Sequence, residues 1–426
     1  PGGFERLTSL PLTPNKKVDR RALPAPQQVR LDVEKTSVAP RDTLELQLIK
    51  IWEKILDVRP IGVRDNFFEL GGHSLLAVRL FAHIKKLTGK NLPLATLFQA
   101  PTVEQLANIL REKGWTAPWS SLVAIQPGGS KPPFFCVHAI GGNVLTYRDL
   151  AYHLGPDQPV YGLQAQGLDG KQPYYTCVED MAAHYVKEIR TLQPEGPYFL
   201  GGSSAGGMVA FEMAQQLHAQ GQQVALLALF DTYGPGYPKP LPTASSFRRK
   251  LYRFIQRLDL HLRNLFLLEP EKRTVYTLSK LRILKKRIRK KVKRNIKDMT
   301  VGSFPGIKYF LPRSLREVAQ ANRQALSSYV PQAYPGRITL FRASKQPKGC
   351  YPDPELGWSG LAAGGLEIHE VPGYHGAIVE EPCVRALVKQ LKVCLQKAQS
   401  AEPIEQRLAS LVYFLLSFTL QILLPC

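Results

Sequence analysis

The sequence has few of the features that mark metal-bound, disulfide-bonded or secreted proteins. Its 426 residues include six cysteines, and no two of them form a CxxC pair. This spacing argues against a zinc site and against a disulfide framework, and it favours a reducing, cytoplasmic location. A signal peptide is absent and the first residue is Pro rather than Met. The first residue leads us to expect a piece of a longer protein. The cysteine spacing leads us to expect no metal site.

Long hydrophobic runs are also scarce. The apolar stretch LVYFLLSFTLQILL, residues 411–424, is shorter than the roughly 20 residues that a membrane-spanning helix needs. We favour a docked or disordered terminal helix over a membrane contact through this tail. The sequence gives no role for the tail as a whole, residues 397–426.

Acidic residues are outnumbered by basic ones. The chain has 34 Asp and Glu against 56 Lys and Arg, which gives a formal net charge of +22. Such an excess usually indicates a polyanionic partner. Most of the excess, however, lies within residues 247–297, and the chain contains no zinc finger and no RNP sequence. We therefore expect that it does not bind nucleic acid.

Helical patterns occupy residues 39–114. The segments DTLELQLIKIWEKIL, SLLAVRLFAHIKKLTG and TVEQLANILREKG place apolar residues at helical spacing, and Asp42 or Thr43 is a suitable cap for the first. These segments predict a small bundle of three or four helices. A stretch rich in Pro, Lys and Arg precedes the bundle over residues 1–38, and a linker follows it over residues 115–132.

Strand and helix patterns alternate from residue 133 to about residue 396. PFFCVHAI, PVYGLQ, PYFLGG, QVALLALF, RITLFRA and LEIHEV are strand patterns, and VEDMAAHYVKEIRTL and MVAFEMAQQLHAQG are helical. This alternation predicts an α/β domain whose mostly parallel sheet is covered by helices on both faces. The basic segment interrupts it, with apolar residues at every fourth position from Leu284 to Ile296. It predicts an amphipathic helix in a lid over about residues 234–315.

The motif GGSSAGG lies between the strand PYFL and the helix MVAFEMA. Centring GxSxG on Ser204 places glycine at both ends, whereas centring it on Ser203 leaves Ala205 where the last glycine should be. A serine on a sharp turn between strand and helix is typical of a hydrolase nucleophile. The Ala205 amide, at the helix N-terminus, is then a candidate donor to an oxyanion.

Two further residues complete a hydrolase pattern. Asp231 ends the strand VALLALF, at the carboxyl edge where the sites of open α/β sheets gather. His375 follows the strand LEIHEV after the turn PGY, whereas His369 lies inside that strand and is expected to pack or to face solvent. The order Ser204, Asp231, His375 is the order nucleophile, acid, base of α/β hydrolases. We therefore predict a catalytic triad of these three residues.

A second oxyanion donor is expected in the loop HAIGG, which follows the strand FFCV. The loop lies at a strand end, as the triad residues do, and its Ile140 amide is the candidate that would act beside the Ala205 amide. His138, the first residue of the loop, is expected to be structural rather than catalytic.

The segment DNFFELGGHSLLAVRL, residues 65–80, resembles the core motif of acyl and peptidyl carrier domains. In that family the serine after Gly-Gly-His receives a 4′-phosphopantetheine arm from a phosphopantetheinyl transferase, which implies attachment at Ser74. The resemblance predicts a carrier domain over residues 39–114. A phosphodiester on Ser74 would lie at a helix N-terminus, which favours an anion, and Gly71 and Gly72 would allow close approach to the backbone.

The segment FERLTSLPLTPNKKVDRRALP, residues 4–24, resembles the C-terminal end of an adenylation domain. Lys17 falls on the family's conserved lysine position, but Lys16 stands where the family usually has glycine. Nearly all of such a domain is missing, so residues 1–38 predict a remnant and a linker without adenylation activity. They imply that further synthetase domains lie upstream.

The motifs FCVHAIGG, GGSSAGG, LALFDTYG and EVPGYHGAIVEEP resemble those of the thioesterase domains that end nonribosomal peptide synthetases. The resemblance implies an α/β-hydrolase fold over residues 133–396. It also implies that Ser204 takes the acyl or peptidyl chain from its thioester and releases it, by hydrolysis or by macrocyclisation. The rival hypothesis is a carrier scaffold whose hydrolase-like domain only docks and does not release.

The basic lid allows three interpretations. It is a solvated amphipathic helix, a docking surface for an acidic carrier face or the phosphate of the arm, or a contact with an anionic membrane. We favour the first. The acyl substrate and the oligomeric state are not fixed by the sequence.

Overall fold

The computed structural model describes part of the chain, and the statements below concern that part: residues 38–112, 119–239, 241–242, 312–347 and 349–400. These residues group into two compact units. The first contains residues 38–90 and 99–112, and the second contains residues 91–98 and those from 119 onward. The expected adenylation remnant, the lid helix near Leu284 and the apolar tail lie outside the described residues.

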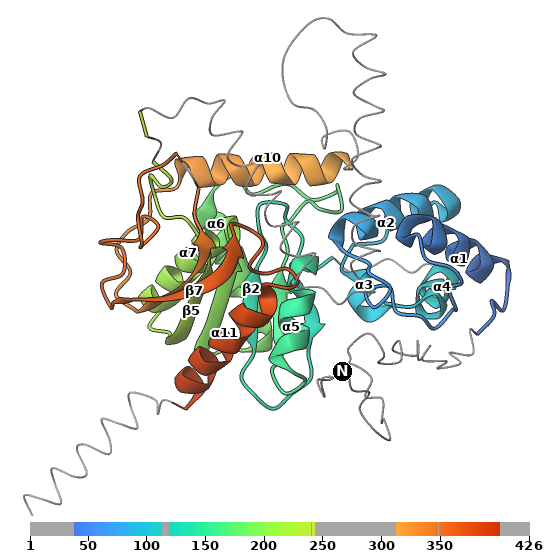
Figure 1. The fold of residues 1–426 in the computed structure, drawn as a ribbon, viewed down its shortest axis with the longest axis horizontal. Helices are drawn as coiled ribbons and strands as arrows, with labels where there is room; N and C mark the ends of the chain where they lie inside the picture. The colour runs from blue at the N-terminus through green and yellow to red at the C-terminus, as the bar shows by residue number, and fades with distance from the viewer. Residues whose placement is uncertain (1–37, 113–118, 240, 243–311, 348, 401–426) are drawn as a thin grey trace, which may run out of the picture. The chain divides into compact units, whose positions relative to one another are not determined.

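Helices build the first unit, as the apolar spacing predicted (Figure 1). Its helices are α1 (Thr43–Leu56), α2 (Ser74–Thr88) and α4 (Val103–Arg111). The short α3 (Thr96–Gln99) lies between them in sequence, and all but its last residue groups with the second unit. Trp52 of α1 and Phe67 are fully buried and meet edge to face, with ring centroids 5.3 Å apart. Leu80 of α2 and Leu106 of α4 are fully buried as well. The helices thus enclose a small apolar core.

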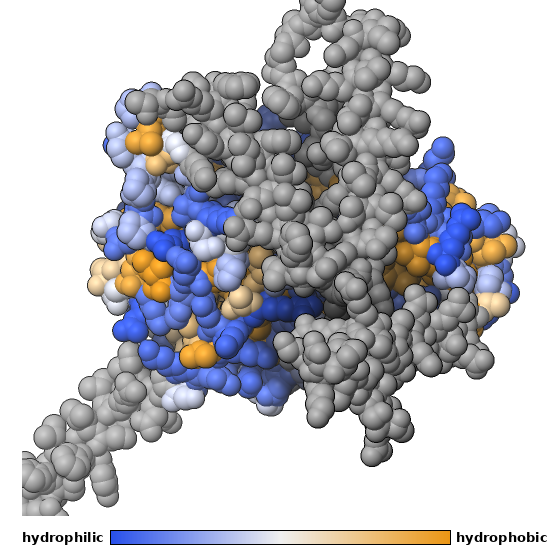
Figure 2. Space-filling view, in the orientation of Figure 1, coloured by the Kyte–Doolittle hydropathy of each residue, from blue (hydrophilic) through white to orange (hydrophobic). Residues whose placement is uncertain are grey.

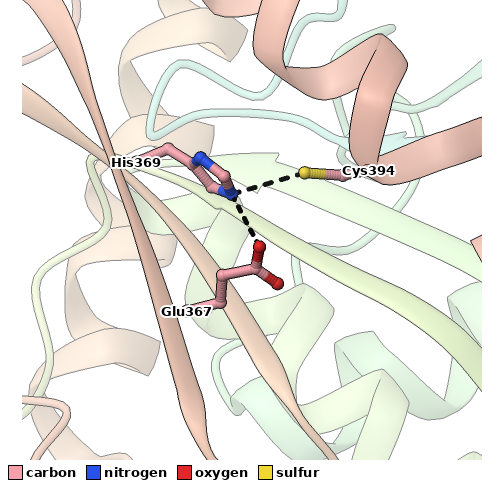
Figure 3. A group of neighbouring side chains, drawn as sticks. All are labelled: Glu367, His369 and Cys394. Carbon is pink, nitrogen blue, oxygen red and sulfur yellow. Dashed lines mark hydrogen bonds and ion pairs between the residues drawn. The ribbon is translucent and has the colours of Figure 1, made fainter. Parts of the chain in front are cut away.

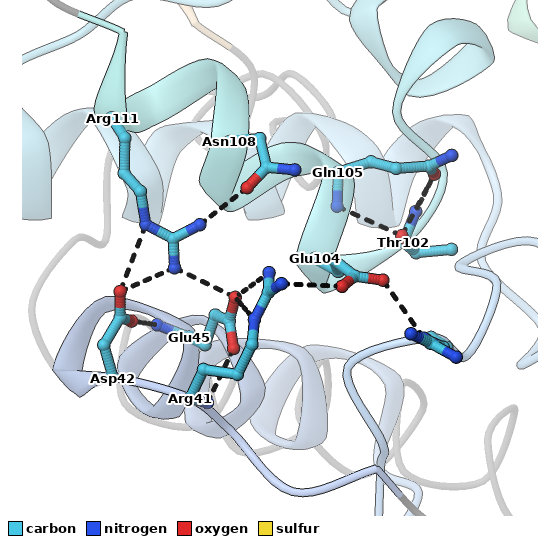
Figure 4. Close-up of polar contacts among 9 residues, drawn as sticks. Arg41, Asp42, Glu45, Thr102, Glu104, Gln105, Asn108 and Arg111 are labelled. Atoms are coloured by element: carbon cyan, nitrogen blue, oxygen red, sulfur yellow. Dashed lines mark hydrogen bonds and ion pairs between the residues drawn. The ribbon is translucent and has the colours of Figure 1, made fainter.

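An ionic network fixes α1 against α4 (Figure 4). Asp42 caps α1 by accepting a hydrogen bond from the Glu45 amide at 2.9 Å. The buried Glu45 carboxylate binds Arg41 at 2.6 Å and Arg111, at the end of α4, at 2.9 Å. These guanidinium groups lower the pKa of Glu45 to about 2, since they stabilise its charged form.

Seven strands form one sheet in the second unit, in the order β1-β3-β2-β4-β5-β6-β7. β1 pairs antiparallel with β3, and every other neighbouring pair is parallel. The strands are β1 (Leu122–Gln126), β2 (Phe134–Val137), β3 (Val160–Leu163), β4 (Tyr198–Ser203), β5 (Val224–Phe230), β6 (Ile338–Lys345) and β7 (Leu366–Tyr374). The predicted fold, a small helical unit followed by a mostly parallel α/β unit, is confirmed.

Helices cover both faces of this sheet. They are α5 (Arg148–Leu154), preceded by the 3-10 turn η1 (Leu145–Tyr147), and α6 (Val178–Leu192), α7 (Ala205–Ala219) and α11 (Val384–Gln399). A further helix, α10 (Arg313–Ser328), packs against α7. Neighbouring residues of β2 point to opposite faces: Phe135 packs with α6 and α7, whereas Phe134 packs with α5 and α11. The sheet is therefore buried on both sides, which explains why its central strands are apolar throughout.

Two expectations about strands were wrong. Residues 122–126, assigned to the linker from the sequence, form the edge strand β1. The segment PGY, predicted to be a turn, is the end of β7, which runs on to Tyr374 with an irregular register beside Ala343 and Lys345. Proline is tolerated there because β7 is the outer strand of the sheet.

The visible surface of the described residues is mainly hydrophilic, with apolar side chains in separate groups (Figure 2). No helix in this part of the chain combines the length and the apolar character needed to cross a bilayer.

Candidate active site

The turn that carries Ser204 connects β4 to α7. Ser204 has φ 55° and ψ −117°, a backbone conformation that side chains with a Cβ rarely adopt. A Cβ on Gly202 would collide with the backbone of Gly206, and a Cβ on Gly206 would collide with the carbonyl oxygens of Val137 and His138. Both motif glycines are therefore required by close backbone packing, and they hold Ser204 at the carboxyl end of the sheet.

The three predicted triad residues lie in one hydrogen-bonded chain. The Ser204 hydroxyl lies 3.0 Å from His375 Nε2, and His375 Nδ1 lies 2.8 Å from Asp231 Oδ2. An ionised carboxylate only accepts hydrogen bonds, so Nδ1 donates to Asp231 and the lone pair of Nε2 faces the serine. This tautomer is the one that can remove the hydroxyl proton.

Hydrogen bonds from three donors fix the Asp231 carboxylate. It is fully buried, and its second oxygen, Oδ1, accepts hydrogen bonds from the Ala343 amide at 2.8 Å and from Gln346 Nε2 at 3.1 Å. With the bond from His375, three donors face this carboxylate. They fix its orientation and compensate for its burial. Gln346 was not predicted, because it follows β6 and no local pattern connects it to Asp231.

Tyr233 supports His375 from one side. Its ring stacks on the imidazole with centroids 4.4 Å apart and an interplanar angle of 25°, and Tyr237 packs edge-on against Tyr233 at 5.2 Å. Burial raises the pKa of Tyr233, so its hydroxyl stays protonated at physiological pH. Sequence analysis missed this residue, although it stands in the quoted segment LALFDTYG, two positions after Asp231.

The two predicted oxyanion donors lie on adjacent pieces of backbone. Ala205 is the first residue of α7, and Ile140 lies in the loop after β2. Because the start of α7 packs directly on the carbonyl groups at the end of β2, this loop is held beside the nucleophile turn. The arrangement suits two backbone amides that act together on one oxygen.

Tyr147 ties the same two pieces of backbone together. Its buried hydroxyl donates a hydrogen bond to the Val137 carbonyl at 2.6 Å and accepts one from the Ser203 amide at 2.9 Å. Burial raises the pKa of this hydroxyl, which keeps it neutral. The residue precedes α5 and is far from the motif in sequence, so no spacing could have predicted its position.

Ser74 begins α2 in the first unit and is half-buried. The preceding residue, His73, is the N-cap, and its side chain makes no capping hydrogen bond; the positive end of the helix dipole therefore lies at Ser74 and favours an anion. Gly71 has φ 87°, and a Cβ on Gly72 would collide with the ring and the carbonyl of Phe67. The residues around Ser74 therefore fit a phosphate-linked group.

One group of side chains has the composition of a metal site (Figure 3). His369 Nε2 lies 3.1 Å from a Glu367 carboxylate oxygen and 3.4 Å from Cys394 Sγ, and the imidazole stacks on Phe341. Burial raises the pKa of the Cys394 thiol to about 11. The contact of His369 Nε2 with Cys394 joins β7 to α11. As predicted, His369 packs and is not part of the triad.

Comparisons with known proteins agree with this geometry. A family model described as "Thioesterase domain" matches residues 132–393, more than half of the chain, and one described as "Phosphopantetheine attachment site" matches residues 47–110. Malpinin synthetase of Mortierella alpina is 46% identical over 234 residues, which are 54% of this chain and 3% of that protein. A dimodular nonribosomal peptide synthase of Bacillus subtilis (strain 168) is 43% identical over 244 residues, 57% of this chain and 10% of that protein.

A solved structure gives the same picture. The crystal structure of a four-domain nonribosomal peptide synthetase bound to AMP and glycine is 32% identical to this chain, with a TM-score of 0.50. The match covers 91% of this chain and 28% of that one. The chain thus spans only a small part of the length of these relatives.

Proposed function

The chain belongs to the thioesterase domain family, and from that premise we propose that it forms the releasing end of a nonribosomal peptide synthetase. In this proposal residues 39–114 carry an acyl or peptidyl chain, and residues 133–396 remove it. The observation that carries the proposal is the hydrogen-bonded chain of Ser204, His375 and Asp231 in a domain that follows a phosphopantetheine attachment site.

The first chemical step transfers the acyl group to the enzyme. Ser204 Oγ attacks the acyl carbonyl carbon while His375 Nε2 removes the hydroxyl proton, and Asp231 stabilises the imidazolium that forms. The amides of Ile140 and Ala205 donate hydrogen bonds to the developing oxyanion. His375 then returns the proton to the departing sulfur, which leaves an ester on Ser204.

The second step uses the same residues in reverse. His375 removes a proton from water, or from a hydroxyl or amine of the bound chain itself, and that atom attacks the Ser204 ester. Water gives a free acid, and an internal nucleophile gives a ring. The proton taken up by His375 returns to Ser204 Oγ as the ester bond breaks. Both outcomes use one triad, so the choice between them depends on which nucleophile reaches the ester.

The carrier unit would hold its cargo through Ser74. When bound there, 4′-phosphopantetheine supplies a thiol that carries the acyl chain as an activated thioester. The N-terminus of α2 would stabilise the phosphate. Gly71, beside which no other atom lies close, would leave room for the transferase that attaches it, whereas the space beside Gly72 is filled by Phe67 and the expectation of close approach there is wrong. A phosphopantetheinyl transferase and upstream synthetase domains are the proposed partners. The five cysteines in the described residues are free thiols, which supports a cytoplasmic location.

Loading the chain tests the proposal directly. An acyl-pantetheine group is transferred enzymatically to Ser74, and the intact mass of the protein is followed over time. We expect the wild type to lose the acyl mass and Ser204→Ala to retain it. Ser203→Ala, which changes the other serine of the same motif, is the matched control and should release the acyl group. Release by Ser204→Ala at the wild-type rate would show that another residue is the nucleophile.

The rival, a hydrolase-like domain that only docks, is separated by a serine-directed fluorophosphonate. An activated serine reacts with this reagent, and an ordinary one does not. We expect labelling of the wild type at Ser204, and no labelling of His375→Ala because the base is gone. An unlabelled wild type would favour the docking role.

A further inference from the structure

Buried side chains hold the loop after β2 in place. His138 is 1% exposed, and both of its ring nitrogens have partners. Nδ1 lies 2.8 Å from the Ala139 carbonyl oxygen, and Nε2 lies 2.8 Å from the hydroxyl of Tyr185 on α6. A carbonyl oxygen only accepts, so Nδ1 carries a proton and donates it to Ala139. Burial lowers the pKa of His138 to about 4, and the ring therefore remains neutral at physiological pH.

The carbonyl that His138 binds belongs to a particular peptide group. The Ala139 carbonyl and the Ile140 amide are the two ends of one planar unit, and in a trans peptide they point in opposite directions. Fixing the carbonyl therefore fixes the direction of the Ile140 N–H. The Gly142 amide donates to the same oxygen at 2.9 Å, so both lone pairs of that carbonyl are used.

The next peptide group is held from another element. Asn322 of α10 is 4% exposed, and its side-chain amide donates to the Ile140 carbonyl at 3.1 Å. α10 is anchored in turn by the Tyr174 hydroxyl, which donates to Glu317 at 2.6 Å. Tyr329, the residue that follows the helix, donates its hydroxyl to Glu212 of α7 at 2.6 Å. Ile140 thus lies between two peptide groups whose carbonyls both bind buried side chains.

We propose that His138 and Asn322 are positioning residues that aim the Ile140 amide at the oxyanion. His138 holds the peptide that carries this amide, and Asn322 holds the peptide that follows it. Neither side chain contacts the substrate. Their effect is to keep the donor in place before the charge develops, so that no backbone rotation is needed during the reaction. The inference rests on the proposed function in two respects: that Ser204 is the nucleophile, and that the Ile140 amide donates to the oxyanion.

The test uses a pair of small substrates on the full chain, a p-nitrophenyl ester and the thionoester in which sulfur replaces the carbonyl oxygen. Sulfur accepts hydrogen bonds poorly, so the rate ratio of the pair reports how well the oxyanion donors are aimed. The variants are His138→Leu, His138→Asn, in which the amide can replace Nδ1 as donor, and Asn322→Leu. Ser327→Ala, elsewhere on α10, is the control.

We expect kcat for the oxygen ester to fall about 10- to 100-fold in His138→Leu and in Asn322→Leu, part of the roughly 10²–10³-fold lost when a donor is removed outright. KM should change little, and the preference for oxygen over sulfur should shrink with kcat. His138→Asn should recover most of kcat and most of the preference for oxygen, and Ser327→Ala should match the wild type. A variant with reduced kcat and an unchanged oxygen preference would be merely destabilised, which would overturn the inference.

Two outcomes separate this inference from the proposed function. If the wild type cleaves the small ester but never releases the chain loaded on Ser74, the release function fails while the ester pair still tests the positioning. If His138→Leu does not fold, His138→Asn and Asn322→Leu decide alone. An unchanged kcat in Asn322→Leu would then refute a role for that residue.

Discussion

Ser204 and Asp231 share an uncommon backbone conformation. Their φ angles are 55° and 45°, although neither residue is glycine. Such conformations cost of order 1–3 kcal/mol each and persist only where the surroundings determine them. Here the surroundings are neighbouring strands: the Ser204 amide donates to the Phe230 carbonyl at 3.1 Å, and the Asp231 amide donates to the Phe341 carbonyl at 2.8 Å. The sheet thus holds in place two strained residues, the proposed nucleophile and the proposed acid.

At the same scale, Tyr233 restrains the proposed base. Replacing its ring by Leu removes the surface on which His375 stacks, so the imidazole would sample orientations that do not face Ser204. We expect Tyr233→Leu to lower kcat for the p-nitrophenyl ester by roughly tenfold. Tyr233→Phe keeps the ring and should stay close to the wild type. Equal losses in both variants would indicate that the hydroxyl matters and not the stacking.

At the scale of elements, the Glu45 network determines how α1 and α4 meet. The carboxylate lies between two guanidinium groups, one beside each helix end. Removing its charge leaves the two arginines without their shared partner. Both arginines are partly exposed and keep a second partner, Glu104 or Asp42. The buried Glu45 side chain, however, would lose its charge-assisted hydrogen bonds to both of them, so both helices should loosen together.

Glu45→Gln should therefore reduce the protection of the α1 and α4 amides from hydrogen exchange in the full chain, by about 1–3 kcal/mol in opening free energy. The pKa of Glu45 is lowered from 4.5 to about 2 in the folded state. The stabilisation is thus present above about pH 4.5 and is lost as the pH falls towards 2.

The difference between wild type and Glu45→Gln should shrink over that range. Lys50→Gln, an exposed change on α1, serves as the control and should leave protection unchanged. A difference that stays constant down to pH 2 would assign the effect to packing and not to charge.

The elements were predictable where their signals are local. Periodicity and caps located α1, α2 and α4, and apolar runs located the central strands, because these strands are buried on both faces. The edges were not predictable in this way. β1 is short and lies in a segment rich in turn residues, and the end of β7 contains Pro372 and Gly373, which usually mark a turn. At an edge, pairing with one neighbour overrides that local preference.

At the scale of the whole molecule, the proposal gives Ser74 and Ser204 separate tasks, so their variants should fail separately. Ser74→Ala should prevent the mass gain that the transferase produces, while hydrolysis of the p-nitrophenyl ester by Ser204 continues at the wild-type rate. Ser204→Ala should show the opposite pattern. Intact mass and ester kinetics measure the two tasks on the same sample. A mass gain that survives Ser74→Ala would move the attachment to another residue.

The site as a whole was predictable only in part. The triad residues stand in motifs at strand ends, so topology brings them together without further information. The residues around them come from distant segments: Tyr147 meets the nucleophile turn, Gln346 meets Asp231, and Asn322 meets the loop after β2. Such contacts depend on the packing of whole elements. No pattern in a single sequence specifies them.

The position of Pro372 has a consequence for how the molecule behaves among other chains. β7 is the outermost strand, and an outer strand offers unpaired amides and carbonyls to any extended segment nearby. Proline lacks an amide, so at Pro372 the strand has no backbone donor to offer to another strand. An added strand would therefore lack one hydrogen-bond donor at Pro372, which disfavours regular pairing at this end of the edge. Such an edge would protect the enzyme from self-association through its sheet.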